Sequence, residues 1–210
     1  MTMGFRRLIV PIGGEATHLD PGYRAALIAS AALNAFMFFV EGGVGLTIGS
    51  AALLADAVDF LEDAGIYALA VVALAWRPRS RAFVGLVMGL AMLGVGLVAV
   101  WQIVDRLFHG GAPASGAMAI TAAAALAVNI YCASRLVRWK RGDASMRSIW
   151  LSTRNDAILN AATILAAGLV AWTATAWPDI AAGALIAGIN IWASIGIMFQ
   201  ARRELKGTPT

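Results

Sequence analysis

The chain has 210 residues, of which 60% are hydrophobic and only 13% are charged. A soluble globular domain is usually about half apolar and about a quarter charged, so this composition indicates an integral membrane protein. The single cysteine, Cys132, excludes an intrachain disulfide and any site built on paired cysteines. The formal net charge of +4 does not indicate nucleic-acid binding, because the Lys and Arg residues fall in short gaps between apolar runs.

Six apolar segments follow one another, and each approaches the roughly 20 residues that a helix needs to cross a bilayer core. All six are predicted to be helices, because lipid does not tolerate unpaired backbone groups and the segments are too long for barrel strands. The predicted spans are 24–47, 51–76, 82–107, 113–137, 148–174 and 179–202. We therefore expect an all-α bundle of six transmembrane helices over 24–202, with an N-terminal segment, 1–23, and a short tail, 203–210.

The basic residues predict the orientation of this bundle. Fourteen of the 16 Lys and Arg lie before the first span, between spans two and three, between spans four and five, or after span six. The opposite loops carry only Arg106, and Arg154 falls inside span five. By the positive-inside rule, both termini face the cytoplasm. We expect a multi-pass protein of a bacterial inner membrane.

The second span contains the acidic stretch LLADAVDFLEDAG and no Lys or Arg. A carboxylate at a helix centre costs roughly 2.5–3.5 kcal/mol on insertion scales, so such residues are functional candidates. Asp59 and Asp63 share one helix face, Asp56 lies on the same face, and Glu62 lies off it. Carboxylates stacked in a low dielectric repel one another, which suits them to exchanging a proton for a cation.

The fifth span supplies a complementary face. Ser152, Asp156 and Asn160 recur at four-residue spacing and present oxygen ligands on one side of the helix. If the antiparallel spans two and five touch, Asp59 lies level with Asp156 and Asp63 level with Ser152. Three carboxylates with a hydroxyl or amide form a reasonable shell for a divalent cation.

Three further charged residues stand inside or at the edge of spans. Glu41 is an intramembrane acid and therefore a candidate for a gate or proton path. Arg154 should point away from Asp156, and it either reaches the membrane surface or pairs with Glu62. Asp179 is interpreted as a cap of its own helix, in preference to a role in an outer vestibule.

The run LNAFMFFVEGGVGLTIGSAALLADAVDFLEDAG resembles the first two helices of the cation diffusion facilitators. The family has an Asn and a Glu in helix one, then Gly-Ser-x-Ala-Leu-Leu-Ala-Asp-Ala and a His/Asp-x-x-x-Asp pair. The matching positions are Asn34, Glu41, Gly49, Ser50, Asp56, Asp59 and Asp63. WQIVDRL, Asn129, MRSIWLSTRND and WPDIAAGALIAGI resemble later family segments in the same order, so the resemblance covers about residues 24 to 202.

The resemblance implies a divalent-metal/proton antiporter, usually homodimeric, that exports zinc or a related metal such as Mn, Fe, Co or Cd from the cytoplasm. It implies that Asp59, Asp63 and Asp156 are the metal ligands. Accessory or proton-path roles are expected for Glu41, Asp56, Asn160 and Asn34. The expected partners are the lipid bilayer, the transported cation and protons, and no permanently bound cofactor is expected.

Two departures from the family pattern affect these expectations. Ser152 stands where the family commonly has a histidine, and an all-oxygen site shifts preference toward harder ions such as Mn²⁺. Asn155 or a water molecule could fill the vacancy, which leaves Zn²⁺ and Fe²⁺ as candidates. The cytoplasmic C-terminal domain of the family has no counterpart after residue 202, so we expect membrane helices to hold any homodimer.

Other functions remain as alternatives to transport. A membrane scaffold or partner subunit with a degenerate metal site would bind no cation. An intramembrane metalloenzyme is disfavoured, because such sites usually use histidine and the spans contain none. A proton channel would conduct protons without any metal dependence. We therefore expect a secondary transporter and not an enzyme.

Overall fold

The computed structural model describes residues 21–72, 78–109, 111–139 and 144–206, and the predicted N-terminal segment lies mostly outside this range. These described residues form six long α-helices and no strand. The helices are α1 (Pro21–Ile48), α2 (Ala51–Val72), α3 (Pro78–His109), α4 (Ser115–Leu136), α5 (Ala144–Thr173) and α6 (Trp177–Leu205), with a 3-10 turn, η2 (Val137–Trp139), after α4. Their bounds agree with the six predicted spans to within a few residues.

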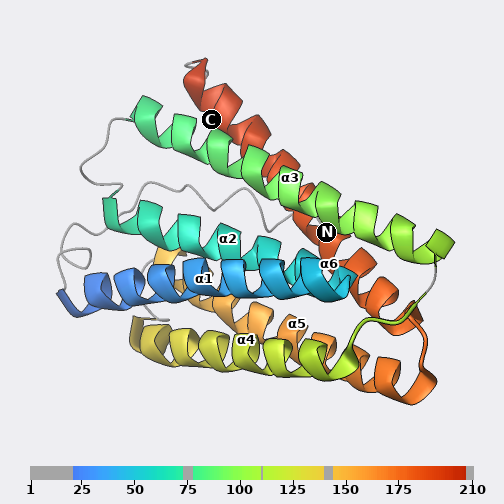
Figure 1. Ribbon diagram of the computed structural model, residues 1–210. Helices are drawn as coiled ribbons and strands as arrows, with labels where there is room; N and C mark the ends of the chain where they lie inside the picture. Colours follow the sequence, from blue (N-terminus) through green and yellow to red (C-terminus); the bar gives the residue numbers. More distant parts are fainter. Residues whose placement is uncertain (1–20, 73–77, 110, 140–143, 207–210) are drawn as a thin grey trace.

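The helices pack mainly in pairs. α1 lies along α2, α3 along α6, and α4 along α5, and α2 also packs against α3 and α6. In Figure 1, α1 and α2 lie between α3 on one side and α4 and α5 on the other. α6 crosses the bundle obliquely and contacts α5, α2 and α3 in turn (Figure 1). This arrangement places α2 at the centre of the bundle.

Five of the described helices are long and apolar enough to cross a membrane, and α2 is the exception. A stretch of about 18 residues that crosses a membrane normally carries few charges. Every 18-residue stretch of α2 contains all four of its carboxylates, which is why α2 is the exception. Residues 51–58 of α2 are all buried, and Ala68 is the one exposed residue of the helix. The surrounding helices therefore enclose α2, so its carboxylates need not face lipid.

The other helices present large apolar side chains outward. Phe39 of α1, Phe108 of α3, Ile120 of α4 and Trp172 of α5 are between 72% and 83% exposed. A soluble protein rarely exposes so much apolar surface, whereas a membrane-embedded bundle requires it. The structure thus supports an integral membrane bundle with an apolar outside and a polar inside.

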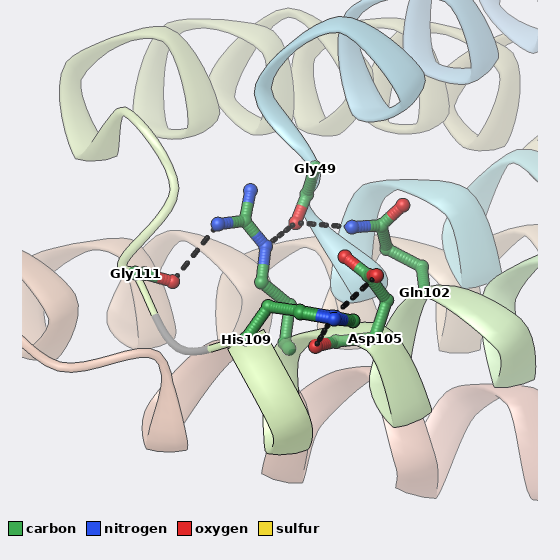
Figure 2. Close-up of polar contacts among 6 residues, drawn as sticks. Gly49, Gln102, Asp105, His109 and Gly111 are labelled. Carbon is green, nitrogen blue, oxygen red and sulfur yellow. Dashed lines mark hydrogen bonds and ion pairs between the residues drawn. The ribbon is translucent and has the colours of Figure 1, made fainter.

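The turn between α1 and α2 is held by a cation from α3. Gly49 has a φ of +66°, in the left-handed region that favours glycine. The guanidinium of Arg106 donates to the Gly49 carbonyl (2.9 Å), the Ile48 carbonyl (2.6 Å) and the Gly111 carbonyl (2.9 Å). Figure 2 labels Gly49 and Gly111, two of the residues whose carbonyl oxygens accept these hydrogen bonds. The single basic residue of the predicted outer loops therefore neutralises the carboxyl end of α1.

An anion from α6 holds the start of α2. The carboxylate of Asp179 accepts from the Ser50 hydroxyl (2.6 Å) and from the backbone N–H groups of Ala51 (2.8 Å) and Ala52 (3.1 Å). The sequence analysis assigned this carboxylate to its own helix, whereas these hydrogen bonds cap α2. The first N–H groups of a helix lack partners within it, so a buried carboxylate stabilises them strongly.

Close contact between α2 and α6 also depends on a glycine. A Cβ atom at Gly183 would lie 2.6 Å from the backbone carbon of Ala51, closer than any real contact. Gly188, on the same helix, would meet nothing within 4 Å. Gly183 therefore sets the spacing of the two helices, and Gly188 does not.

Replacing Gly183 by alanine should destabilise the bundle by about 1–3 kcal/mol, because the added methyl group forces α6 away from the α2 backbone. Gly188→Ala is the matched control and should leave stability unchanged or slightly higher. The apparent melting temperature in detergent measures both. Equal melting temperatures for the two variants would contradict the proposed contact.

Asp179→Ala should destabilise the protein by about 0.5–2 kcal/mol, the usual effect of removing a helix cap. Asp105→Ala serves as the control, since its carboxylate pairs with the exposed ring of His109 on the surface (2.9 Å; Figure 2). Such an exposed pair contributes about 0–1 kcal/mol. Unfolding in detergent should therefore separate the two variants, and a larger effect at Asp105 would refute the capping role.

Candidate metal centre

α2 and α5 meet over a short stretch beside one of the predicted ligands. The Tyr67 hydroxyl donates to Asp63 Oδ2 at 2.7 Å. The same hydroxyl is hydrogen-bonded to Thr153 Oγ1 of α5. Tyr67 and Thr153 are fully buried and Asp63 is 3% exposed. The predicted contact between these two helices is therefore present, and it runs through side chains that the sequence analysis did not select.

The three predicted acidic ligands are neighbours. The charge of Asp156 interacts most strongly with Asp63 and next with Asp59. Yet within the described ranges, no three His, Cys, Asp or Glu side chains lie close enough together to hold a metal ion.

The interior of the bundle contains side-chain oxygens that lack hydrogen-bond donors. Among the described residues, every buried side-chain nitrogen or oxygen without a partner is an oxygen. One is the Ser30 hydroxyl, which is itself a donor, and the others are acceptor oxygens of Asn34, Glu41, Asp56, Asp59, Asn129, Asp156 and Asn160. Buried polar atoms in folded proteins are nearly always satisfied. An excess of acceptors over donors therefore indicates an interior built for positive charge.

Glu41 of α1 and Asp56 of α2 form the most deeply buried acidic pair. Both residues are 0% exposed, and none of their four carboxyl oxygens has a donor. The two side chains face each other, so one can hydrogen-bond to the other only when one carries a proton. The pair therefore has the chemistry of a proton-binding element or of half a cation site.

Two buried amides present their oxygens to the interior. Asn34 Nδ2 donates to the Ser30 carbonyl, and Asn160 Nδ2 donates to the Asp156 carbonyl, both at 2.8 Å. In each residue one N–H donates to the backbone, and Oδ1 has no donor. Both amides can therefore present Oδ1 as an acceptor toward a cation or a proton carrier.

The α5 side of the site differs from the predicted face. Ser152 is partly exposed, whereas Thr153 is fully buried against α2. Asn155, the suggested replacement for the missing histidine, is exposed, and its Oδ1 accepts from Arg154 Nη2 at 3.0 Å. The inward stripe of α5 thus contains Thr153, Asp156 and Asn160, and the structure does not bring Asn155 into it.

Arg154 points away from the acidic interior, as expected. Its side chain is exposed, and its guanidinium lies 5.6 Å from the ring centre of Trp150. The described residues show no ion pair between Arg154 and Glu62, so of the two suggested arrangements only the outward one is present. Arg154 is therefore not an internal counter-charge of the acidic cluster.

Sequence reasoning missed Asn190 of α6 as well as Tyr67 and Thr153. Asn190 is 1% exposed, its Nδ2 donates to the Ala55 carbonyl of α2 at 2.9 Å, and its side chain lies beside Asp59. A sequence signal existed for two of these residues. Asn190 interrupts an apolar span, and Tyr67 follows Asp63 by four residues on the same face.

An apolar-coated helical bundle with unpartnered oxygens inside defines an integral membrane protein built to handle cations. Comparison with protein families gives the particular class. The model of one protein family, described as the cation efflux transmembrane domain, matches residues 27–205 of this chain. The chain belongs to this family, the cation diffusion facilitators, and is a transporter of metal ions.

Proposed function

We propose that the protein exports zinc or a related divalent transition metal from the cytoplasm in exchange for protons. The observation that carries this proposal is the set of buried oxygens without donors around α2. A group of carboxylates in a low dielectric must hold either protons or a cation, so alternate occupancy by the two couples their movements. The family supplies the class of cargo, a metal cation.

In this proposal Asp59, Asp63 and Asp156 bind the cation, and Ser152 or a water molecule completes the shell. Asn155 is a weaker candidate, because its oxygen already accepts from Arg154 on the exposed side of α5. An all-oxygen site suits Mn²⁺ and tolerates Zn²⁺, Fe²⁺, Co²⁺ and Cd²⁺. The metal is cargo that the carboxylates exchange, and no permanent cofactor is involved.

We assign proton transfer to the Glu41–Asp56 pair, with Asn34 and Asn160 as accessory acceptors. The pair is completely buried and lies one turn from Asp59 along α2. Protons that the cation displaces from the ligands have carboxyl oxygens within the same helix interface to receive them. A group that receives the displaced protons is needed for exchange of protons against cations and is not needed for metal binding alone, so the buried pair supports antiport.

Transport through this bundle requires a conformational change. Beside Asp63, Tyr67 belongs to a buried apolar cluster with Tyr23, Leu27 and Ile149. At the opposite end, Asp179 clamps the start of α2. These contacts hold α2 on both sides of the proposed cation site. We therefore propose that the helices rock against one another and expose the site alternately to the two sides of the membrane.

The membrane context of this proposal follows from the charge pattern and the family. Both termini face the cytoplasm of a bacterial inner membrane, and all six helices, including α2, span the bilayer. A homodimer would form through the transmembrane helices. Spin labels or cysteine accessibility at Arg106 and Arg203 would test the orientation, since the two positions should lie on opposite sides.

A second candidate function is a non-transporting scaffold or partner subunit. The observation that favours it is that the described acidic side chains do not gather into a group of three. Titration calorimetry with Zn²⁺, Mn²⁺ and Cd²⁺ separates the two functions. A transporter binds at least one of these ions, and a scaffold binds none.

Asp63→Asn and Asp156→Asn should each abolish metal-dependent flux in proteoliposomes, because a neutral amide removes the charge that offsets dehydration of the cation. The reduction should exceed about a hundredfold, as loss of a charged ligand costs several kcal/mol. Asp105→Asn, on the exposed end of α3, should transport at the wild-type rate. Normal transport by both site variants would contradict the assignment.

Glu41→Gln should lower the number of protons moved per cation while leaving cation binding within about threefold of wild type, because the glutamine keeps the size of the side chain and cannot release a proton. Simultaneous recording of internal pH and metal uptake measures the ratio. A Leu46→Ala control, at an exposed position of the same helix, should not change the ratio. An unchanged ratio in Glu41→Gln would remove Glu41 from the proton path.

A further inference from the structure

We propose that Tyr67 determines which cations the site accepts, by restricting Asp63 to a single free oxygen. This inference rests on the proposed function, since it concerns the selectivity of the same site. Tyr67 lies outside the acidic pattern and one helical turn beyond Asp63. Its hydroxyl donates to Asp63 Oδ2 at 2.7 Å, which occupies one lone pair of that oxygen and favours binding of a cation through Oδ1 alone.

The tyrosine hydroxyl is fixed on both helices. It is hydrogen-bonded to Thr153 Oγ1 of α5 as well as to Asp63 of α2. Because the Tyr67 proton goes to Asp63, the single Thr153 proton is donated either to the Tyr67 oxygen or to the Ile149 carbonyl, which lies 3.0 Å from Thr153 Oγ1. A donor held from two sides cannot follow Asp63 if that carboxylate rotates. The bond therefore constrains the orientation of Asp63 as well as its free oxygen.

The ring of Tyr67 has no room to swing away. Tyr67 is 0% exposed and packs in a cluster with Tyr23, Leu27, Leu136 and Ile149, which come from α1, α4 and α5. Release of Asp63 Oδ2 would require these helices to separate. In the closed arrangement, Asp63 thus offers one oxygen to any cation that enters.

The number of oxygens that a carboxylate offers bears on cation size. Calcium-sized ions take about six to eight oxygen ligands and commonly use bidentate carboxylates. Zinc is satisfied by about four ligands at shorter distances. A site whose carboxylate can bind only through one oxygen offers too few oxygens to a large ion and enough to a small one. Tyr67 therefore favours small transition-metal ions over Cd²⁺ and Ca²⁺.

The remaining acidic ligands do not compensate for this restriction in the same way. Asp59 Oδ2 and Asp156 Oδ2 have no donor, so each is already available to a cation of any size. Asp59 likewise has one side-chain hydrogen bond, from Asn190, so Tyr67 is distinguished by a hydroxyl that can be removed without changing the shape of the ring. Removal of the hydroxyl alone should therefore change selectivity more than it changes binding of the preferred ion.

The test compares Tyr67→Phe with wild type in proteoliposomes, with KM and maximal rate measured separately for Zn²⁺, Mn²⁺, Cd²⁺ and Ca²⁺. Phenylalanine keeps the ring in the cluster and removes only the hydroxyl. We expect the ratio of KM for Cd²⁺ to KM for Zn²⁺ to fall by roughly tenfold, the effect of about one charge-assisted hydrogen bond. The maximal rate for Zn²⁺ should stay within about twofold.

Tyr131→Phe is the matched control. It makes the same substitution on the exposed side of α4, where Tyr131 is 47% exposed, so selectivity among the four ions should stay as in wild type. A Tyr67→Phe protein that transports with an unchanged ratio would overturn the proposal and leave the transport function intact. An equal loss for all four ions in a folded variant, with a wild-type melting temperature, would also overturn it.

Calorimetric binding of the same four ions gives a second measurement. If the wild type binds cations without transporting them, the transport function is refuted. The selectivity role is then tested alone, by comparing the ratio of the dissociation constants for Cd²⁺ and Zn²⁺ between Tyr67→Phe and wild type. If the wild type binds none of the four ions, both the selectivity role and the transport function are refuted.

Discussion

A buried carboxylate oxygen to which no protein group donates needs a proton, a cation or a water molecule, and the rest of this structure depends on that constraint. Glu41 and Asp56 are completely buried, and their oxygens have no donor in the described interior. Leaving such groups charged and unpaired is prohibitive in a low dielectric. Positive charge must therefore occupy the centre of the bundle, and exchange between two kinds of positive charge is the basis of antiport.

The packing of the helices serves to keep α2 inside the protein. The other helices coat it, so its four acids avoid lipid, and Gly183 lets α6 approach its backbone closely. At one end, Arg106 neutralises the carboxyl end of α1 and Asp179 caps the start of α2. At the other end, Tyr67 ties α2 to α5. Polar contacts thus hold the acid-bearing helix near both of its ends.

Much of the fold could be predicted from the sequence, because span length and hydropathy depend on local composition. The contact of α2 with α5 also followed from matching acidic faces. Finer features did not follow. The sequence pattern selected Ser152, and it did not select its neighbour Thr153, which is the α5 residue that bonds to Tyr67 of α2. Likewise Asp179 caps a helix 129 residues away from it in sequence, a partner that no local pattern identifies.

The central claim is that cations and protons compete for the same buried oxygens. Calorimetry of Zn²⁺ and Mn²⁺ binding in a series of buffers with different ionisation enthalpies measures the protons released per bound cation. The account predicts an observed enthalpy that changes linearly with buffer ionisation enthalpy, with a slope corresponding to at least about one proton released. Binding with an enthalpy independent of the buffer would contradict it.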